Sequence, residues 1–70
     1  MEQFDAVMIA EGVMPPPGTT DDERAAAYLA AWQQLINTGV AWTLQGWFGR
    51  TAAALIEAGH CTAPGEVTDA

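Results

Sequence analysis

The chain has 70 residues and a formal net charge of −7, from nine acidic and two basic side chains. A chain of this length forms one small domain, and it is too short to combine a cofactor-binding fold with a separate catalytic cleft. Nucleic-acid binding depends on cations that neutralise phosphates, so two arginines exclude direct DNA or RNA binding as well as docking on an anionic membrane. Half of the residues are hydrophobic, which argues against a disordered tail.

Cellular location is indicated by the cysteine content and by the N-terminus. Cys61 is the single cysteine, so no internal disulfide can form, and the chain is not a small oxidised secreted scaffold. The first five residues carry acids where a signal peptide requires bases. The longest apolar stretch, residues 25–32, is far shorter than a membrane span. We expect a soluble cytoplasmic protein.

The chain divides into an opening segment over 1–12, a proline-rich connector over 13–19, a folded centre over 20–59 and a tail over 60–70. The opening segment places Phe4, Val7 and Met8 on one side and is expected to form a short helix that packs on the centre. A strand over 3–10 is the alternative.

The folded centre begins with a predicted helix over 20–37. Thr20 and Glu23 have the spacing of a capping box, in which each side chain bonds the other residue's backbone N–H. Gly39 is placed to end this helix in the left-handed conformation. Helical spacing predicts one apolar face, formed by Ala25, Leu29, Trp32 and Ile36.

A second helix is predicted over 43–58. Thr43 is its expected N-cap, and Trp42 and Trp47 have the positions of a hydrophobic staple around that cap. The joint of about five residues predicts an antiparallel or angled helical hairpin. The expected fold is therefore all-α, a small hairpin with a short N-terminal helix alongside.

Two glycines fall inside the second predicted helix. Gly46 and Gly49 each cost about 1 kcal/mol relative to alanine there, so we expect a compensating role. Close approach by a neighbouring helix or a partner chain is the interpretation that we favour. A break or a 3₁₀ turn near Gly46 competes with it.

Candidate catalytic and metal-binding residues are few. A zinc site requires three or four ligands, and His60 with Cys61 supplies two. The run from Gly46 to Thr51 lacks the lysine and the glycine spacing of a phosphate loop. We expect no metal, no cofactor and no enzymatic activity.

Arg50, the tryptophans and the acids remain as candidates for binding. Arg50 is expected to pair with a carboxylate or helix carbonyls inside the fold, or to converge with its copies on an anionic ligand in an oligomer. The three tryptophans either form the core or leave a partner-binding surface exposed. Six of the nine acids lie in the first 23 residues. They form either a solvated face or a negative patch that binds the basic surface of a partner. The residues chosen for partner binding are Asp21, Asp22, Glu23, Trp42 and Trp47.

The stretch from Leu35 to Gly59 resembles a family of short proteins from tailed bacteriophages. Their shared core runs L-I-x-x-G-x-x-W-x-L-Q-G-x-x-G-R-x-A-x-x-L-I-x-x-G, and the likeness covers about residues 33–66. It is most specific at Leu44-Gln45-Gly46 and at Gly49-Arg50, whereas the prolines at 15–17 depart from the family. The resemblance implies a viral origin and a small accessory role in the host cytoplasm, without an assigned activity.

Together, the composition and the resemblance predict a phage-encoded, non-catalytic inhibitor. Its expected partner is a host defence protein such as a CRISPR–Cas component, bound through an acidic and aromatic surface in the manner of an anti-CRISPR protein. The small core and the glycine-aromatic helix also favour a homo-oligomer. The alternatives are an oligomeric sponge for a small anionic nucleotide with Arg50 as its anchor, and a structural or regulatory phage subunit.

Overall fold

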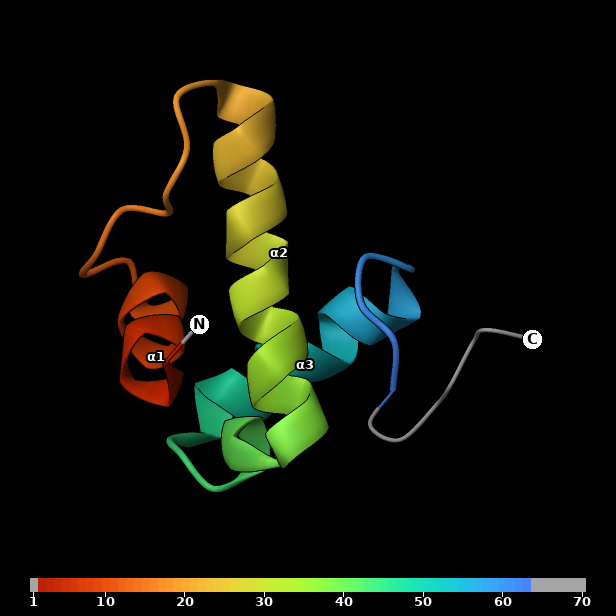
Figure 1. Cartoon of the computed structure of the whole chain (residues 1–70). Coiled ribbons are helices and arrows are strands. Elements are labelled where there is room, and N and C mark those ends of the chain that lie inside the picture. Colours follow the sequence, from red (N-terminus) through yellow and green to blue (C-terminus); the bar gives the residue numbers. More distant parts are fainter. Residues whose placement is uncertain (1, 64–70) are drawn as a thin grey trace.

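The structure is a computed structural model, and it describes residues 2–63. These residues form three α-helices, α1 (Gln3–Glu11), α2 (Asp21–Thr38) and α3 (Gly46–Glu57), with a short 3₁₀ helix η1 (Val40–Trp42) between α2 and α3 (Figure 1). Over this range no strand is present, which confirms the all-α prediction. The alternative of a strand over 3–10 is wrong, since these residues belong to α1.

Helix α1 is stabilised by docking, because nine residues are too few for a stable isolated helix in water. It lies beside the C-terminal half of α2 (Figure 1) and buries Ala6, Ile9 and Ala10. The side of α1 that packs inward is rotated by part of a turn from the side expected from the sequence. Phe4, expected among the packing residues, is 70% exposed.

Helix α2 begins and ends where the sequence predicts. The Glu23 N–H donates to Thr20 Oγ1 at 3.1 Å, and the Thr20 N–H donates to Glu23 Oε1 at 3.3 Å, so both halves of the capping box form. The helix ends at Gly39, whose φ of 82° is a left-handed conformation that costs glycine little. Both predicted signals are confirmed.

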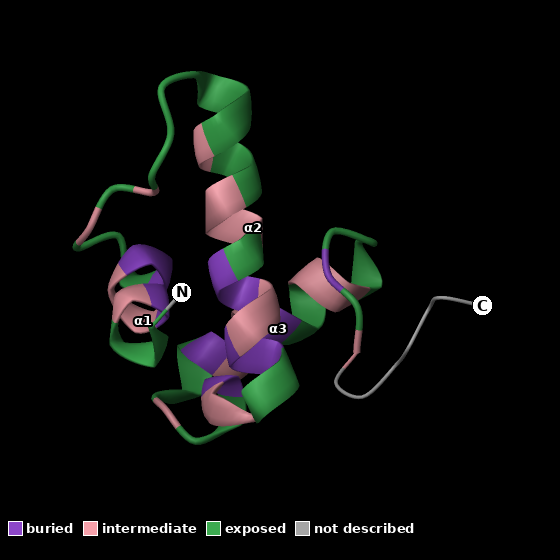
Figure 2. Cartoon of the chain, viewed as in Figure 1, coloured by how far each residue is buried: buried purple, intermediate pink, exposed green. Residues whose placement is uncertain are grey.

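The hydrophobic core lies around the C-terminal half of α2. Trp32 and its neighbours on this half are fully buried, and buried positions gather at the level where α1 and α3 contact α2 (Figure 2). The predicted apolar face is confirmed at Trp32 and Ile36, while Leu29 is half-buried and Ala25 exposed. The fully buried residues of this half are Ala31, Trp32, Leu35 and Ile36.

The start of α3 corrects the sequence prediction. Thr43 does not cap a helix, because its hydroxyl donates to the Val40 carbonyl at 2.8 Å and closes η1 instead. Helix α3 begins at Gly46, so Trp42 and Trp47 do not form the predicted staple. The physical reason is tertiary. Burial of Ala41, which is 0% exposed, holds the chain in η1 before α3 can begin.

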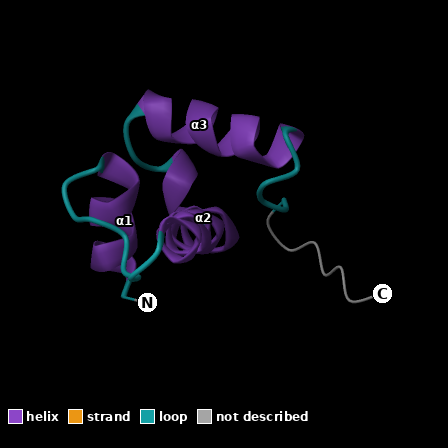
Figure 3. Ribbon diagram, turned by 90° about the horizontal axis from the view of Figure 1, so that it is seen from above, coloured by secondary structure: helices purple, strands orange, loops and turns teal. Residues whose placement is uncertain are grey.

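Helix α3 crosses α2 at a steep angle. When α2 is seen end-on, α3 runs across it (Figure 3), so the hairpin is the angled one of the two expected forms. After α3 the chain turns at Gly59, with φ 86°, and comes back to α2. There the Thr62 N–H donates to Gln33 Oε1 at 2.8 Å and Gln33 Nε2 donates to the Thr62 carbonyl at 3.0 Å. Among the described residues, no helix is long and apolar enough to cross a membrane.

Candidate functional site

The acidic residues chosen from the sequence, Asp21, Asp22 and Glu23, lie at the exposed N-terminus of α2. Their roles differ. Glu23 accepts hydrogen bonds from the Thr19 backbone, the Thr19 hydroxyl and the Thr20 backbone, and these bonds lower the pKa of its carboxyl, the Thr19 backbone contributing most. Its charge is therefore used in the helix cap. Asp21 and Asp22 carry the charge that faces solvent.

Asp21 is also in contact with one of the two arginines. Its Oδ1 accepts a hydrogen bond from Arg24 Nη2 at 2.8 Å, and the side chain of Asp21 is almost fully exposed. An exposed pair of this kind contributes little to stability. Its effect is local, because it holds the guanidinium against the first turn of α2.

An open groove adjoins this acidic end. It has a volume of about 500 Å³ and lies between the N-terminal half of α2, the C-terminal part of α3 and the connector. It forms because α3 crosses α2 and because the turn at Gly59 brings the following residues back toward α2. Its lining residues are Pro16, Arg24, Ala25, Tyr28, Leu29, Leu55 and His60.

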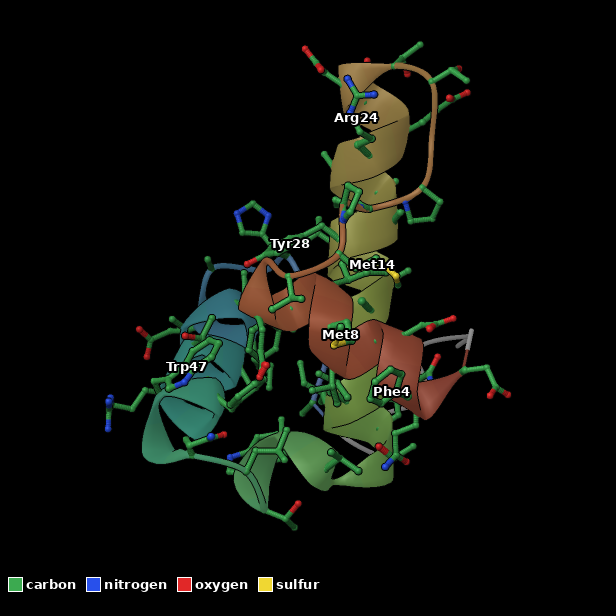
Figure 4. The ribbon with its side chains drawn as sticks, turned by 90° about the vertical axis from the view of Figure 1, so that its left-hand side faces the viewer. Phe4, Met8, Met14, Arg24, Tyr28 and Trp47 are labelled. Carbon is green, nitrogen blue, oxygen red and sulfur yellow. The ribbon has the colours of Figure 1, made fainter. Side chains whose placement is uncertain are left out.

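The chemistry of the groove is mostly apolar with a few polar groups. Ala25, Leu29 and Leu55 supply aliphatic surface, and Tyr28 adds an aromatic ring. Arg24 and Tyr28 lie along the same half of α2 (Figure 4), so one end of the groove meets the acidic cluster through the Asp21–Arg24 pair. The volume is in the range of ligand-binding pockets, and the open shape suits a protruding side chain of a protein.

The two predicted tryptophan contacts lie elsewhere. Trp47 packs against Phe48 with ring centroids 3.9 Å apart and against Trp32 at 6.3 Å. Trp32 is eleven residues beyond Asp21 on α2, which is about 16 Å along the helix axis. The acidic residues and the tryptophans therefore form two separate surfaces, and the structure does not bring the five chosen residues together.

Trp42 and Trp47 are both partly exposed, at 47% and 39%, and they flank opposite sides of α3. A Cβ on Gly49 would lie 3.3 Å from Trp42 Cδ1, so the Trp42 ring covers that residue. Gly49 and Trp47 are two positions apart, which is about 200° around the helix, so the Trp42 ring that covers Gly49 lies on the opposite side of α3 from Trp47. The Trp42 side chain therefore approaches Gly49 closely, whereas the approach of a neighbouring helix or a partner chain at Gly49 stays a prediction.

Gly46 and Arg50 have different surroundings from those predicted. Gly46 is the first residue of α3, and a Cβ there would meet only the flexible end of Arg50, with Nη1 at 3.2 Å. Close packing by a neighbouring helix therefore does not explain Gly46. Arg50 is exposed and has no ion pair within residues 2–63, so the expected internal pair is absent there. It does not line the groove, and its role as an anchor for an anionic ligand stays a prediction.

His60 and Cys61 are adjacent in sequence but differ in environment. His60 is exposed and lines the groove, whereas Cys61 is buried with Sγ 3.9 Å from the Leu29 carbonyl. Desolvation raises the pKa of the Cys61 thiol, which keeps it in the less reactive protonated form. Across residues 2–63 no group of three or more His, Cys, Asp or Glu is arranged to hold a metal ion.

Sequence reasoning did not find Tyr28, Leu29, Leu55 and His60 as site residues. Tyr28 follows Arg24 by one helical turn and Leu29 follows Ala25 by one helical turn, and these spacings are the local signals that relate the groove residues of α2. The other members come together only through the angle between α2 and α3. No pattern in the sequence specifies that angle.

A family comparison covers most of the chain. The model of a domain of unknown function, DUF7417, matches residues 18–70. The chain belongs to this family. No curated protein matches it, and no solved structure does. The matched segment contains α2, η1 and α3 and all groove residues except Pro16, while α1 precedes it.

Proposed function

We propose that this chain is a small, non-catalytic protein-binding domain that takes a basic and apolar segment of another protein. The observation that carries the proposal is the juxtaposition of the apolar groove with Asp21 and Asp22 at the exposed end of α2. In this arrangement a partner's apolar side chain enters between Tyr28, Leu29 and Leu55. Its neighbouring lysine or arginine then lies against the aspartates.

The charge of the chain supports the same partner chemistry. A protein of net charge −7 attracts basic surfaces and repels acidic ones, which raises the association rate with a basic partner and makes it dependent on salt. Apolar contacts in the groove supply affinity, and the aspartates supply orientation. Salt should therefore slow association more than it speeds dissociation.

The partner that we propose is a host defence protein, with a CRISPR–Cas effector as the leading candidate. The support is the resemblance of residues 33–66 to short phage proteins, together with an acidic composition suited to a nucleic-acid-binding groove. A domain bound there would act as an inhibitor by occupying the path of the nucleic acid. It would work in the cytoplasm of the host cell.

The test is a binding titration against purified CRISPR effector complexes loaded with guide RNA. The wild-type domain is expected to bind one of them and to block its binding of target DNA. Charge reversal in Asp21→Lys with Asp22→Lys, or a charge placed in the groove by Leu29→Glu, should weaken that binding by tenfold or more (about 1.4 kcal/mol).

The matched control reverses two acids on α1, Asp5→Lys with Glu11→Lys, which changes the net charge equally. This variant should keep most of the affinity, because neither acid adjoins the groove. Melting temperatures of all variants confirm that the domain remains folded. The proposal fails if no effector binds, or if the α1 and α2 reversals weaken binding to the same extent.

A further inference from the structure

One face of α3 contacts nothing within the described chain. Viewed along α2, helix α3 lies at the edge of the molecule, with its long outer side away from α1 and α2 (Figure 3). Phe48 and Ala52 face inward and are fully buried. The outer positions are exposed, and they are Gly46, Arg50, Ala53, Ala54 and Glu57.

This outer face also differs from the rest of the chain in charge. Its charged residues are Arg50 and Glu57, which balance, whereas the whole chain carries −7. Six of the nine acids lie in the first 23 residues, on α1, at its N-cap and at the N-terminus of α2. A second copy of this acidic chain therefore meets the least repulsion at α3.

The spacing of the two charges makes the face self-complementary. Arg50 and Glu57 are seven residues apart, which is about two turns and about 10 Å along one side of the helix. The midpoint between them falls between Ala53 and Ala54. If a two-fold axis passes through that midpoint, an antiparallel copy of α3 places its Glu57 opposite Arg50 and its Arg50 opposite Glu57.

We propose that two copies of the chain pair through the outer faces of α3, with reciprocal Arg50–Glu57 ion pairs on either side of an Ala53–Ala54 centre. The small side chains at the centre allow the two helices to approach closely. Arg50, which is exposed and has no ion pair within residues 2–63, gains its partner from the second copy. The groove stays open in this dimer, because its lining residue Leu55 faces α2.

The test measures self-association by sedimentation equilibrium over a range of protein concentrations. Arg50→Glu and Glu57→Arg each replace both reciprocal ion pairs by like-charge contacts, so each should raise the dimer dissociation constant by about tenfold or more. The double variant Arg50→Glu with Glu57→Arg restores opposite charges across the axis. It should return the dissociation constant to near the wild-type value at unchanged net charge.

Arg24→Glu is the matched control, because it changes the net charge as Arg50→Glu does but lies on α2. It should leave association within about twofold of wild type, apart from general repulsion that added salt removes. Circular dichroism checks that each variant is folded. The proposal is overturned if the wild type is monomeric at all concentrations, if Arg24→Glu and Arg50→Glu weaken association equally at the same low salt concentration, or if the double variant fails to recover.

Discussion

The two halves of α2 differ in how they are held. The C-terminal half, from Ala31 to Ile36, is enclosed by α1, η1 and α3, and its inward side chains are fully buried. The N-terminal half, from Asp21 to Tyr28, has no fully buried side chain and is held at its start by the capping box. One continuous helix thus joins a packed region to an exposed one.

Because of this difference, the residues that stabilise the fold and the residues proposed to bind a partner lie in different halves of α2. Burial of large apolar side chains is the main source of folding free energy, so the C-terminal half sets the stability of the domain. The N-terminal half has few packing contacts and presents the groove and the acidic residues. Substitutions in that half can therefore change binding at little cost in folding.

The strongest way to test this comparison is Trp32→Ala. It removes a fully buried indole that packs against Phe48 at 5.8 Å, and it should lower the free energy of unfolding by about 3–5 kcal/mol. Trp42→Ala is the control, because its ring is nearly half exposed. Urea denaturation of both variants measures the difference. Equal losses would show that burial in the described structure does not set stability.

A smaller effect is expected from Gln33→Ala, which removes the two hydrogen bonds to Thr62. The free energy of unfolding should fall by about 1–2 kcal/mol, and residues 60–63 should detach more readily from α2. Cys61 lies in that segment, so its thiol should react faster with a disulfide reagent. Asn37→Ala serves as the control, because Asn37 bonds the same Gln33 amide without holding the tail. An unchanged thiol rate would contradict the role assigned to Gln33.

Thr20→Ala tests the exposed half and should cost about 1 kcal/mol by removing the cap on the Glu23 N–H. This loss of stability should be confined to the N-terminal turns of α2. Hydrogen exchange should quicken in the first turns of α2 and stay unchanged near Leu35. A uniform increase along the helix would mean that the two halves unfold as one unit.

The smallest effect is a pH dependence from Glu23. Because its pKa is lower in the folded state, the carboxylate stabilises the fold at pH values above its unfolded pKa. That contribution is lost as the pH falls through the folded pKa. Glu23→Gln should flatten this part of the melting-temperature profile between neutral and acidic pH. A profile identical to wild type would show that the carboxylate bonds to Thr19 and Thr20 do not contribute.

Local signals predicted much of the fold. The cap at Thr20 and the stop at Gly39 depend on residues within a few positions of each other, so the sequence contains all that determines them. The N-cap of α3 was misplaced by two residues, at Thr43 instead of Gln45, because Thr43 is a good N-cap in isolation. Burial of Ala41 and packing of Trp42 on Gly49 hold η1 instead, and both are tertiary effects that the rules of helix capping do not contain.

The candidate site was predicted less well for the same reason. The acids were found from composition, but Trp42 and Trp47 were grouped with them because the path of the chain after α2, which places these residues on η1 and α3, cannot be read from the sequence. The groove depends on the crossing angle of α3 and on the return of the chain after Gly59. Leu55 and His60 carry no signal that would connect them with Tyr28 before that geometry is known.

The environment of Trp32 gives the domain an internal optical probe. Its indole Nε1 is buried and has no hydrogen-bond partner among the described residues, while Trp42 and Trp47 are partly exposed to solvent. An indole in dry surroundings emits at shorter wavelength than a hydrated one and is shielded from collisional quenchers. In the native protein, acrylamide should therefore quench the long-wavelength emission and leave a blue component. That component reports on the packed half of α2 without any added label.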